Sequence, residues 1–267
     1  MSSLFRGVYN RHIHSNSKLS LKVGVSLLLL CIGLMSISPI KAATLTLSSL
    51  NWPPYTGEQI LAGGASVEVV RAALKAVGHD LKVDYYPWSR TIRIIKPAHS
   101  IYSGYFPEYH FPSDEYVFSD PIGVSPVALI EQQQFPIRWS NVKDLNQYRL
   151  GVVHDYQNTL ELDAMIASGM QPVEKANSDE HNIQKVATGR IQGAVIDKYV
   201  FNYLIKQTHL SELHKKIQLN KQLLETRTLH IAFKNTAEGR EWRQALNKGL
   251  KMIDKDKIVQ QYLSTIE

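Results

Sequence analysis

The sequence has a single cysteine among its 267 residues, and that residue, Cys31, lies inside a hydrophobic run near the N-terminus. Leu30 precedes it, whereas a lipid-attached cysteine normally follows a small residue, so we do not expect lipidation. The rest of the chain has no thiol. This excludes disulfides, thiol catalysis and cysteine-ligated metals there, and it is compatible with an oxidising compartment.

The common catalytic signatures are also missing. The sequence has no Gly-x-Ser-x-Gly, no His-Glu-x-x-His and no glycine loop of the kind that binds phosphate. His154 and Asp155 are adjacent, but neighbouring residues of a strand point to opposite faces, which gives little support for acid–base chemistry. We therefore predict no catalytic residue, no metal and no cofactor. A dehydratase-like enzyme that uses Glu108 and Asp197 as an acid–base pair, or a ligand-sensing module, remains an alternative.

One long hydrophobic run is present, VGVSLLLLCIGLMSI from Val23 to Ile37. It is shorter than the about 20 residues that span a membrane, and basic residues precede it, as in a secretory signal peptide. The small residues Ala42 and Ala43 follow at the expected cleavage point. We predict a cleaved signal peptide over residues 1–42 and a periplasmic protein. An uncleaved anchor is disfavoured because Pro39 ends the run early.

Excess charge of one sign is lacking once this segment is set aside. The whole chain has 30 basic and 24 acidic residues, but five of the basic ones and none of the acidic ones lie in residues 1–42. The mature chain then has 25 basic residues against 24 acidic ones. A nucleic-acid partner, which requires clustered positive charge, is not expected.

The remaining sequence alternates between strand and helix patterns. Hydrophobic periodicity and glycine or proline stops predict a first series of strands and helices and then a second, similar series. A late strand and two helices follow. The predicted strands are 44–50, 81–86, 101–105, 127–131, 148–154, 171–175, 194–197 and 228–233, and the predicted helices are 66–77, 87–97, 158–169, 178–189, 242–253 and 258–263.

This alternation indicates an α/β fold with two lobes. We assign residues 43–130 and 228–267 to lobe 1 and residues 131–227 to lobe 2. A chain that crosses to the second lobe and then returns has two crossing segments, which form a hinge beside an interlobe cleft.

Asp197 has the position that a ligand-binding acid would occupy. It follows the apolar strand Ala194–Ile196 directly, and the carboxyl ends of parallel strands face the ligand crevice of an open α/β sheet. Capping of the following segment, 198–205, is the competing interpretation. A second helix start, Asn158-x-x-Glu161, has the pattern of a capping box.

The ordered motifs resemble a known family. They are Trp52-Pro53-Pro54-Tyr55, Pro87-Trp88-Ser89-Arg90, Phe118-Ser119-Asp120-Pro121, and Gly189-Arg190-Ile191 followed by Ala194–Asp197. In this order they are similar to the bacterial extracellular solute-binding proteins of family 3, the polar-amino-acid type with the type II periplasmic binding fold. The similarity covers nearly the whole mature chain.

The resemblance implies a monomer that closes its two lobes on a small polar or zwitterionic solute, amino-acid-like or amine-containing. The loaded protein would deliver the solute to an inner-membrane ABC transporter permease or to a receptor. Tyr55 would cover the ligand, and Asp197 would pair with an ammonium group. The segment Asp155–Thr159, which includes Tyr156 and Asn158, would hold an anion at a helix start.

One departure concerns the ligand's carboxylate. Family members that bind amino acids carry an arginine shortly before the Phe-Ser-Asp-Pro phrase, and here residues 110–116 contain none. This argues against an ordinary α-amino acid. Arg90 could replace that arginine, or it could be a solvated residue of a helix's first turn.

Large aromatic side chains are the other candidates. They fall on predicted loops or strand ends, where they could stack on a ligand or pack the edge of a lobe. Glu108 is a candidate partner for a cationic ligand, and a solvent-facing loop acid is the alternative. The aromatic candidates are Trp52, Tyr55, Trp88 and Tyr105, with Tyr109 beside them.

Overall fold

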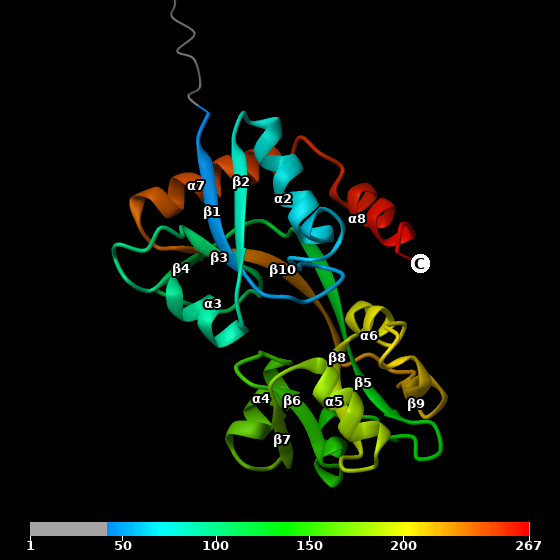
Figure 1. Cartoon of the computed structure of the whole chain (residues 1–267). Helices are drawn as coiled ribbons and strands as arrows, with labels where there is room; N and C mark the ends of the chain where they lie inside the picture. The colour runs from blue at the N-terminus through cyan, green and yellow to red at the C-terminus, as the bar shows by residue number, and fades with distance from the viewer. Residues whose placement is uncertain (1–41, 267) are drawn as a thin grey trace, which may run out of the picture. The chain divides into compact units, whose positions relative to one another are not determined.

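The computed structural model describes residues 42–266. They form an α/β fold, in which helices pack on one sheet of parallel and antiparallel strands (Figure 1). The predicted signal peptide therefore lies outside the described residues, apart from Ala42. No helix within residues 42–266 combines the length and the apolar character that crossing a membrane requires.

The strands are distributed over the whole described chain. They are β1 (Thr44–Ser49), β2 (Asp80–Tyr85), β3 (Gly104–Tyr109), β4 (Tyr116–Phe118), β5 (Gly123–Gln132), β6 (Leu150–Val153), β7 (Val173–Ala176), β8 (Gly193–Asp197), β9 (Ile217–Leu219) and β10 (Glu225–Lys234).

Helices alternate with these strands. They are α2 (Ala65–Ala76), α3 (Trp88–Ile94), α4 (Leu160–Ala167), α5 (Asp179–Ala187), α6 (Lys198–Leu204), α7 (Ala237–Leu250) and α8 (Lys255–Ser264), with short 3₁₀ turns at Leu61–Gly63, Val142–Gln147 and Ser211–Lys215.

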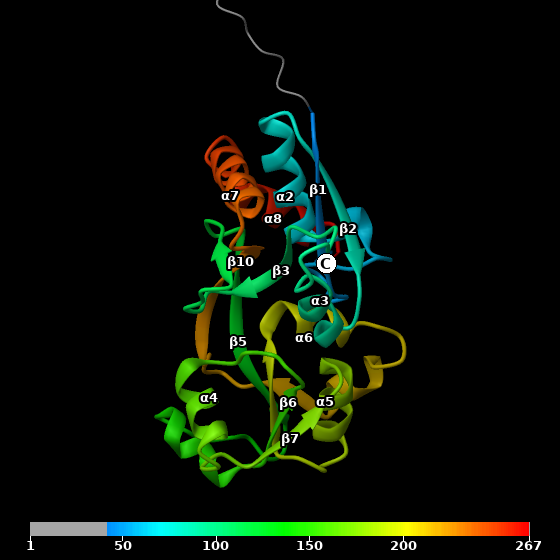
Figure 2. The same ribbon diagram turned by 90° about the vertical axis from the view of Figure 1, so that its left-hand side faces the viewer.

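The sheet has the strand order β2-β1-β3-β10-β5-β8-β6-β7, with β4 beside β10 and β9 beside β5. Strand β1 is parallel to β2 and β3, and β6 is parallel to β7 and β8. The long strands β5 and β10 pair antiparallel between these two parallel groups (Figures 1 and 2). They connect the two parallel groups of strands, and the lobe bounds predicted from the sequence stay a prediction.

Helix α2 shows why the periodicity gave a correct prediction. Val67, Val70 and Leu74 recur at helical spacing, and all three are fully buried. Helix α7 packs on α2 at Gly249, where an added Cβ would lie 1.9 Å from the carbonyl oxygen of Ala73. The helices can approach this closely because glycine has no side chain.

Two local predictions were wrong. The strand predicted at 101–105 is β3, which runs from Gly104 to Tyr109, so Glu108 lies in a strand and is buried rather than in an open loop. The reason is tertiary: β3 pairs with β10 up to Tyr109, and Pro107 does not end it. The capping box at Asn158 is not formed either, because Thr159 caps α4 and accepts from the Leu162 amide.

Substituting Gly249 with alanine should destabilise the protein. Alanine favours a helix intrinsically, but its Cβ would overlap the α2 backbone, so we expect the free energy of unfolding to fall by about 1–3 kcal/mol. Urea denaturation measures the change. Gly123→Ala is the control, since its added Cβ meets only Leu229 at 3.9 Å. Equal stability of the two variants would contradict the packing described here.

Candidate functional site

The loop between β1 and α2 presents two aromatic side chains. The first amides of α2 fix it, since Ala65 N donates to the Pro54 carbonyl (2.9 Å) and Ser66 N donates to the Tyr55 carbonyl (2.9 Å). The rings of Trp52 and Tyr55 stack with their centroids 4.6 Å apart. The first amides of a helix have no acceptor within the helix, and here they donate to the loop and so hold the aromatic pair in place.

Gly64 makes this approach of loop and helix possible. Its φ is 110°, and a Cβ at this position would lie 2.3 Å from the Tyr55 carbonyl oxygen. Glycine alone combines that backbone conformation with the required space.

Asp197 ends β8 and caps α6. Its Oδ1 accepts from the amides of Tyr199 (2.7 Å) and Val200 (2.9 Å). Its Oδ2 accepts from Ser125 Oγ (2.6 Å) and lies 2.9 Å from the Tyr55 hydroxyl. The single proton of the Tyr55 hydroxyl also faces the Val124 carbonyl (2.9 Å), so Tyr55 is a shared fourth donor beside three committed ones. The competing interpretation, that Asp197 caps α6, is confirmed, and its role as a ligand contact stays a prediction.

Burial sets the protonation of Asp197. The side chain is 4% exposed, and loss of solvation raises its pKa to about 6 although the four hydrogen bonds oppose the rise. The Tyr55 hydroxyl, buried beside this carboxylate, has its pKa raised well above its usual value, first by burial and then by the charge of Asp197. Tyr55 therefore remains a neutral donor.

Asp179 is a second buried acid beside Asp197. It is the first residue of α5, after the capping residue Ser178, and it is 7% exposed. Burial raises its pKa to about 7, the charge of Asp197 adds to the rise, and a hydrogen bond from the Trp52 side chain opposes it. The sequence indicated only a helix start here, because an acid in a first turn is a common capping feature.

Glu108 is the third buried acid, on β3. Its Oε1 accepts from the Tyr109 amide (2.7 Å), and its Oε2 accepts from the Tyr105 hydroxyl (3.2 Å). Burial raises its pKa to about 7, and the nearby positive charge of Arg227 opposes the rise. Two protein donors reach this carboxylate in the described part of the chain, against four for Asp197.

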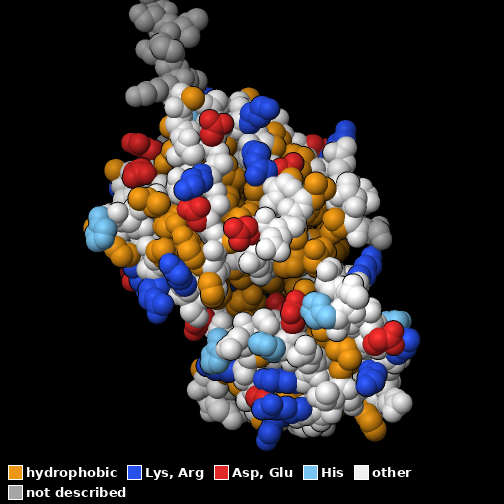
Figure 3. Space-filling model, viewed as in Figure 1, with side chains coloured by type: hydrophobic (Ala, Val, Ile, Leu, Met, Phe, Trp, Pro, Cys, Tyr) orange, Lys and Arg blue, Asp and Glu red, His pale blue; other side chains and the backbone are white. Residues whose placement is uncertain are grey.

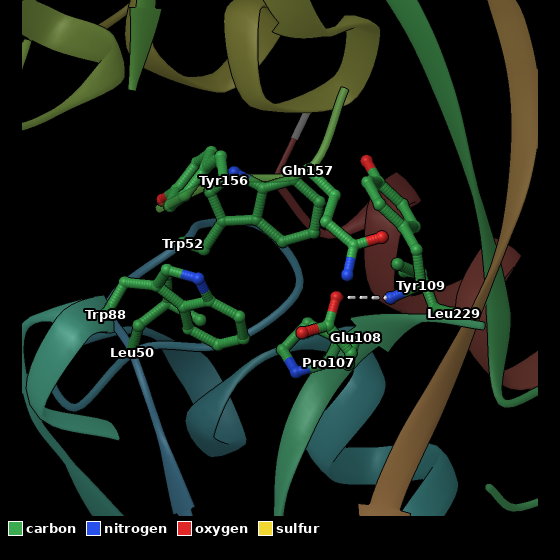
Figure 4. Close-up of a pocket in the computed structure, with 9 residues that line it drawn as sticks. All are labelled: Leu50, Trp52, Trp88, Pro107, Glu108, Tyr109, Tyr156, Gln157 and Leu229. Atoms are coloured by element: carbon green, nitrogen blue, oxygen red, sulfur yellow. Dashed lines mark hydrogen bonds between the residues drawn. The ribbon is translucent and has the colours of Figure 1, made fainter. Parts of the chain in front are cut away.

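Two adjoining cavities separate these acids. Figure 4 shows the first, with the Glu108 carboxylate and the Gln157 side chain pointing toward each other between aromatic rings. Its lining comprises Leu50, Trp52, Trp88, Pro107, Glu108, Tyr109, Tyr156, Gln157 and Leu229. The second is lined by Trp52, Tyr109, Val127, Val153, Tyr156, Gln157, Asn158, Asp179, Val195, Ile196 and Asp197.

A wider opening leads from the surface toward these cavities. It has about 1480 Å³ of empty space, part of it open to solvent, and Trp52, Trp88, Tyr156 and Asp179 are among its lining residues. Figure 3 shows hydrophobic side chains gathered in the hollow on this side of the molecule. Neither of the two inner cavities is lined by a lysine or an arginine.

Hydrogen bonds from α3 and β10 hold the segment that precedes α4. Trp88 Nε1 donates to the Asp155 carbonyl (2.9 Å), and the Ser89 hydroxyl donates to the Asp155 carboxylate. Arg227 Nη1 donates to the Asn158 carbonyl (2.6 Å), and its guanidinium lies over the Tyr109 ring, 4.1 Å from the centroid. These bonds join α3, β3 and β10 to the segment before α4.

The structure brings most of the nine predicted site residues together. Trp52, Trp88, Glu108 and Tyr156 line the first cavity, and Asn158 and Asp197 line the second. Their roles as ligand contacts stay predictions.

The other three predicted residues lie differently. Tyr55 contacts Asp197, and Tyr105 donates to Glu108 from a fully packed position. Arg90 is exposed, with its guanidinium over the Tyr86 ring (4.6 Å), and it lines neither cavity. The arrangement therefore does not support the hypothesis that Arg90 binds a ligand carboxylate in place of the missing arginine.

Arg227, Ser125 and Asp179 were not identified from the sequence as site residues, and Gln157 was included only as part of the segment Asp155–Thr159. Arg227 is 8% exposed within β10, where its neighbours gave an ordinary strand pattern, and only the fold places it beside Asn158. No residue-type signal could have found these three. Residues 42–266 contain no group of three or more histidine, cysteine, aspartate or glutamate side chains that could hold a metal ion.

Comparison with solved structures identifies the fold. The chain is similar to the GluR0 ligand-binding core from Nostoc punctiforme in complex with L-glutamate, at 16% identity, over 83% of this chain and 98% of that one, with a TM-score of 0.65. A histidine kinase sensor domain with similarity to periplasmic binding proteins gives 15% identity, 84% and 95% coverage, and a TM-score of 0.68.

A third similar structure is the amino acid ABC transporter substrate-binding protein AbpA from Streptococcus pneumoniae, bound to L-arginine. It gives 15% identity, 84% and 96% coverage, and a TM-score of 0.65. No family model matches the chain, and no curated protein sequence matches it. The fold is thus the two-lobed type II periplasmic-binding-protein fold, as the sequence predicted.

Replacing Asp197 with alanine should cost more than removing a cap alone. The change removes the α6 cap and leaves the buried Ser125 hydroxyl without this acceptor, while Tyr55 can still donate to the Val124 carbonyl, so we expect a loss of about 3 kcal/mol of unfolding free energy. Asp254→Ala, which removes the exposed cap of α8, should cost only about 1 kcal/mol. Denaturant titration compares them, and equal losses would refute the four-donor arrangement.

The raised pKa of Glu108 predicts a pH-dependent stability. The folded protein keeps a proton on this carboxyl at a pH where the unfolded chain has released it, so the unfolding free energy falls as pH rises from about 4 to about 7. Glu108→Gln should lose less stability than the wild type between pH 5 and pH 8, by on the order of 2 kcal/mol. Parallel curves of unfolding free energy against pH would show that Glu108 is not buried as described.

Proposed function

We propose that this chain is an exported solute-binding protein that captures a small polar solute carrying an amine between its two lobes, without catalysis. The protein would act in the periplasm as a monomer, after cleavage of residues 1–42. We further infer that it is related to the family 3 solute-binding proteins, a relation that the ordered motifs support.

We assign residues 43–130 and 228–267 to lobe 1 and residues 131–227 to lobe 2. The change of partners along β5 supports this division, since its first half pairs with β10 and its second half pairs with β8. The crossings would then fall in β5 and β10, and bending of these two strands would open and close the cleft.

The observation that carries the proposal is the joint lining of the inner cavities. Lobe 1 contributes Trp52, Trp88 and Glu108, while lobe 2 contributes Tyr156 and Asp179. A site built from both lobes is complete only when they meet, so a solute that contacts both sides stabilises the closed form. The bond from Trp88 to the Asp155 carbonyl joins the two lobes so defined and would add to that closed form.

A dehydratase-like activity has less support. It would need Glu108 and Asp197 to exchange protons with a substrate. Asp197 already accepts four protein hydrogen bonds and caps α6, so moving its proton would break the local structure. Proton transfer requires a group within hydrogen-bond reach of the substrate, and Asp197 does not offer a free one.

Two of the similar structures support a proposal for where the captured solute goes. AbpA is the substrate-binding protein of an amino acid ABC transporter, and we propose delivery to an inner-membrane ABC permease here as well. The sensor domain of a histidine kinase has the same fold, so a receptor is the alternative partner. Both uses require the same capture of a solute.

A thermal-shift screen tests the proposal. The purified protein is heated with amino acids, amines, small peptides and organic acids, and an amine-bearing solute should raise the melting temperature. At a hundred times its dissociation constant, a ligand adds about 2.7 kcal/mol to the stability of the folded state. Organic acids without an amine serve as the negative set. If no solute raises the melting temperature while some compound is converted, the enzyme alternative replaces this proposal.

A further inference from the structure

The charge of the cavity walls restricts the chemistry of the solute. Glu108 lines the first cavity, Asp179 and Asp197 line the second, and neither cavity is lined by a basic side chain. The nearest described arginine, Arg227, is engaged by the Asn158 carbonyl and the Tyr109 ring. A carboxylate placed here would be repelled by the acids, and the nearby charge of Arg227 offsets that repulsion only in part, on the Glu108 side, whereas an ammonium group would be attracted.

The two inner cavities share part of their lining. Trp52, Tyr109, Tyr156 and Gln157 line both cavities, so the cavities adjoin and an acid faces each of them. Trp88 packs edge-on against Tyr156, with ring centroids 6.1 Å apart, and closes the first cavity. Aromatic faces bind both methylene groups and cations, which suits a short aliphatic chain with charged ends.

The three acids differ in how many hydrogen-bond acceptor positions remain free on each carboxylate. Asp197 accepts from three committed protein donors and shares a fourth, the Tyr55 hydroxyl, with the Val124 carbonyl. Glu108 accepts two, from the Tyr109 amide and the Tyr105 hydroxyl. Asp179 has its ionised form favoured by the Trp52 side chain and by its own backbone amide. Since an ionised carboxylate has about four acceptor positions, Glu108 and Asp179 each retain room for a ligand ammonium.

We propose that the solute is a small organic dication of the α,ω-diamine class, with one ammonium held by Glu108 and the other by Asp179. Its methylene chain lies against Trp52 and Tyr156, which separate the two acids. Asp197 acts as a positioning residue that fixes Tyr55, Ser125 and the start of α6. This assignment rests on the proposed function and names its ligand.

Isothermal titration calorimetry on the purified protein tests the assignment. The probes are α,ω-diamines with three to eight carbons, n-alkylamines of matched length, and ω-amino acids in which a carboxylate replaces one ammonium. One diamine length should bind at least tenfold more tightly than the matched monoamine. The ω-amino acid should bind more weakly still, because its carboxylate meets a buried acid.

Two substitutions locate the ammonium groups. Asp179→Asn and Glu108→Gln should each reduce the diamine affinity at least tenfold, to about the level of the monoamine, while monoamine binding is retained at the remaining acid. Glu161→Gln is the control, since it removes an exposed acid from the first turn of α4 that lines neither cavity nor the opening. It should change the affinity less than twofold.

The outcomes separate the two proposals. If L-amino acids bind and every diamine fails, solute capture stands and the dication is wrong. Equal affinity for diamines and monoamines, or for diamines and ω-amino acids, also overturns the dication. If no solute of any class binds, the proposed function fails together with it. The comparison of ligands uses the wild-type protein, so it remains decisive if a variant does not fold.

Discussion

The structure of the site depends on which groups replace the water that buried carboxylates lose. A charged acid that loses its hydration is costly unless donors or a cation replace the water. Asp197 receives four protein donors, and these donors come from the loop after β1, from β5 and from the start of α6. The same compensation is incomplete at Glu108 and Asp179, whose pKa values burial raises to about 7. We infer that ammonium groups of the ligand bind to the acceptor positions of Glu108 and Asp179 that protein donors leave open.

Helix starts organise this region. The first amides of α2 hold the loop of Trp52 and Tyr55, Asp179 is the first residue of α5, and Asp197 caps α6. Negative charge is favoured at the positive end of a helix dipole, which eases the burial of both aspartates. The fold thus tolerates two neighbouring acids that would otherwise repel each other strongly.

The sequence predicted the architecture better than the chemistry. Helical spacing located α2 and α7, and the apolar run before Asp197 located β8, since local patterns determine such elements. The bounds of β3 were predicted wrongly because pairing with β10 extends this strand past Pro107. Asp179 and Arg227 were missed because an acid in a helix's first turn and a lone arginine in a strand look ordinary. Only tertiary contact shows that Asp179 lines the second cavity and that Arg227 reaches the Asn158 carbonyl.

The central claim is that buried, partly protonated acids receive a cationic ligand. Calorimetric titration of the preferred diamine at pH 6.5, in buffers of different ionisation enthalpy, measures the protons exchanged on binding. Because the amines are already charged at this pH, pairing should ionise Glu108 and Asp179 and release protons to the buffer. Binding with no net proton release, or with proton uptake, would contradict the account.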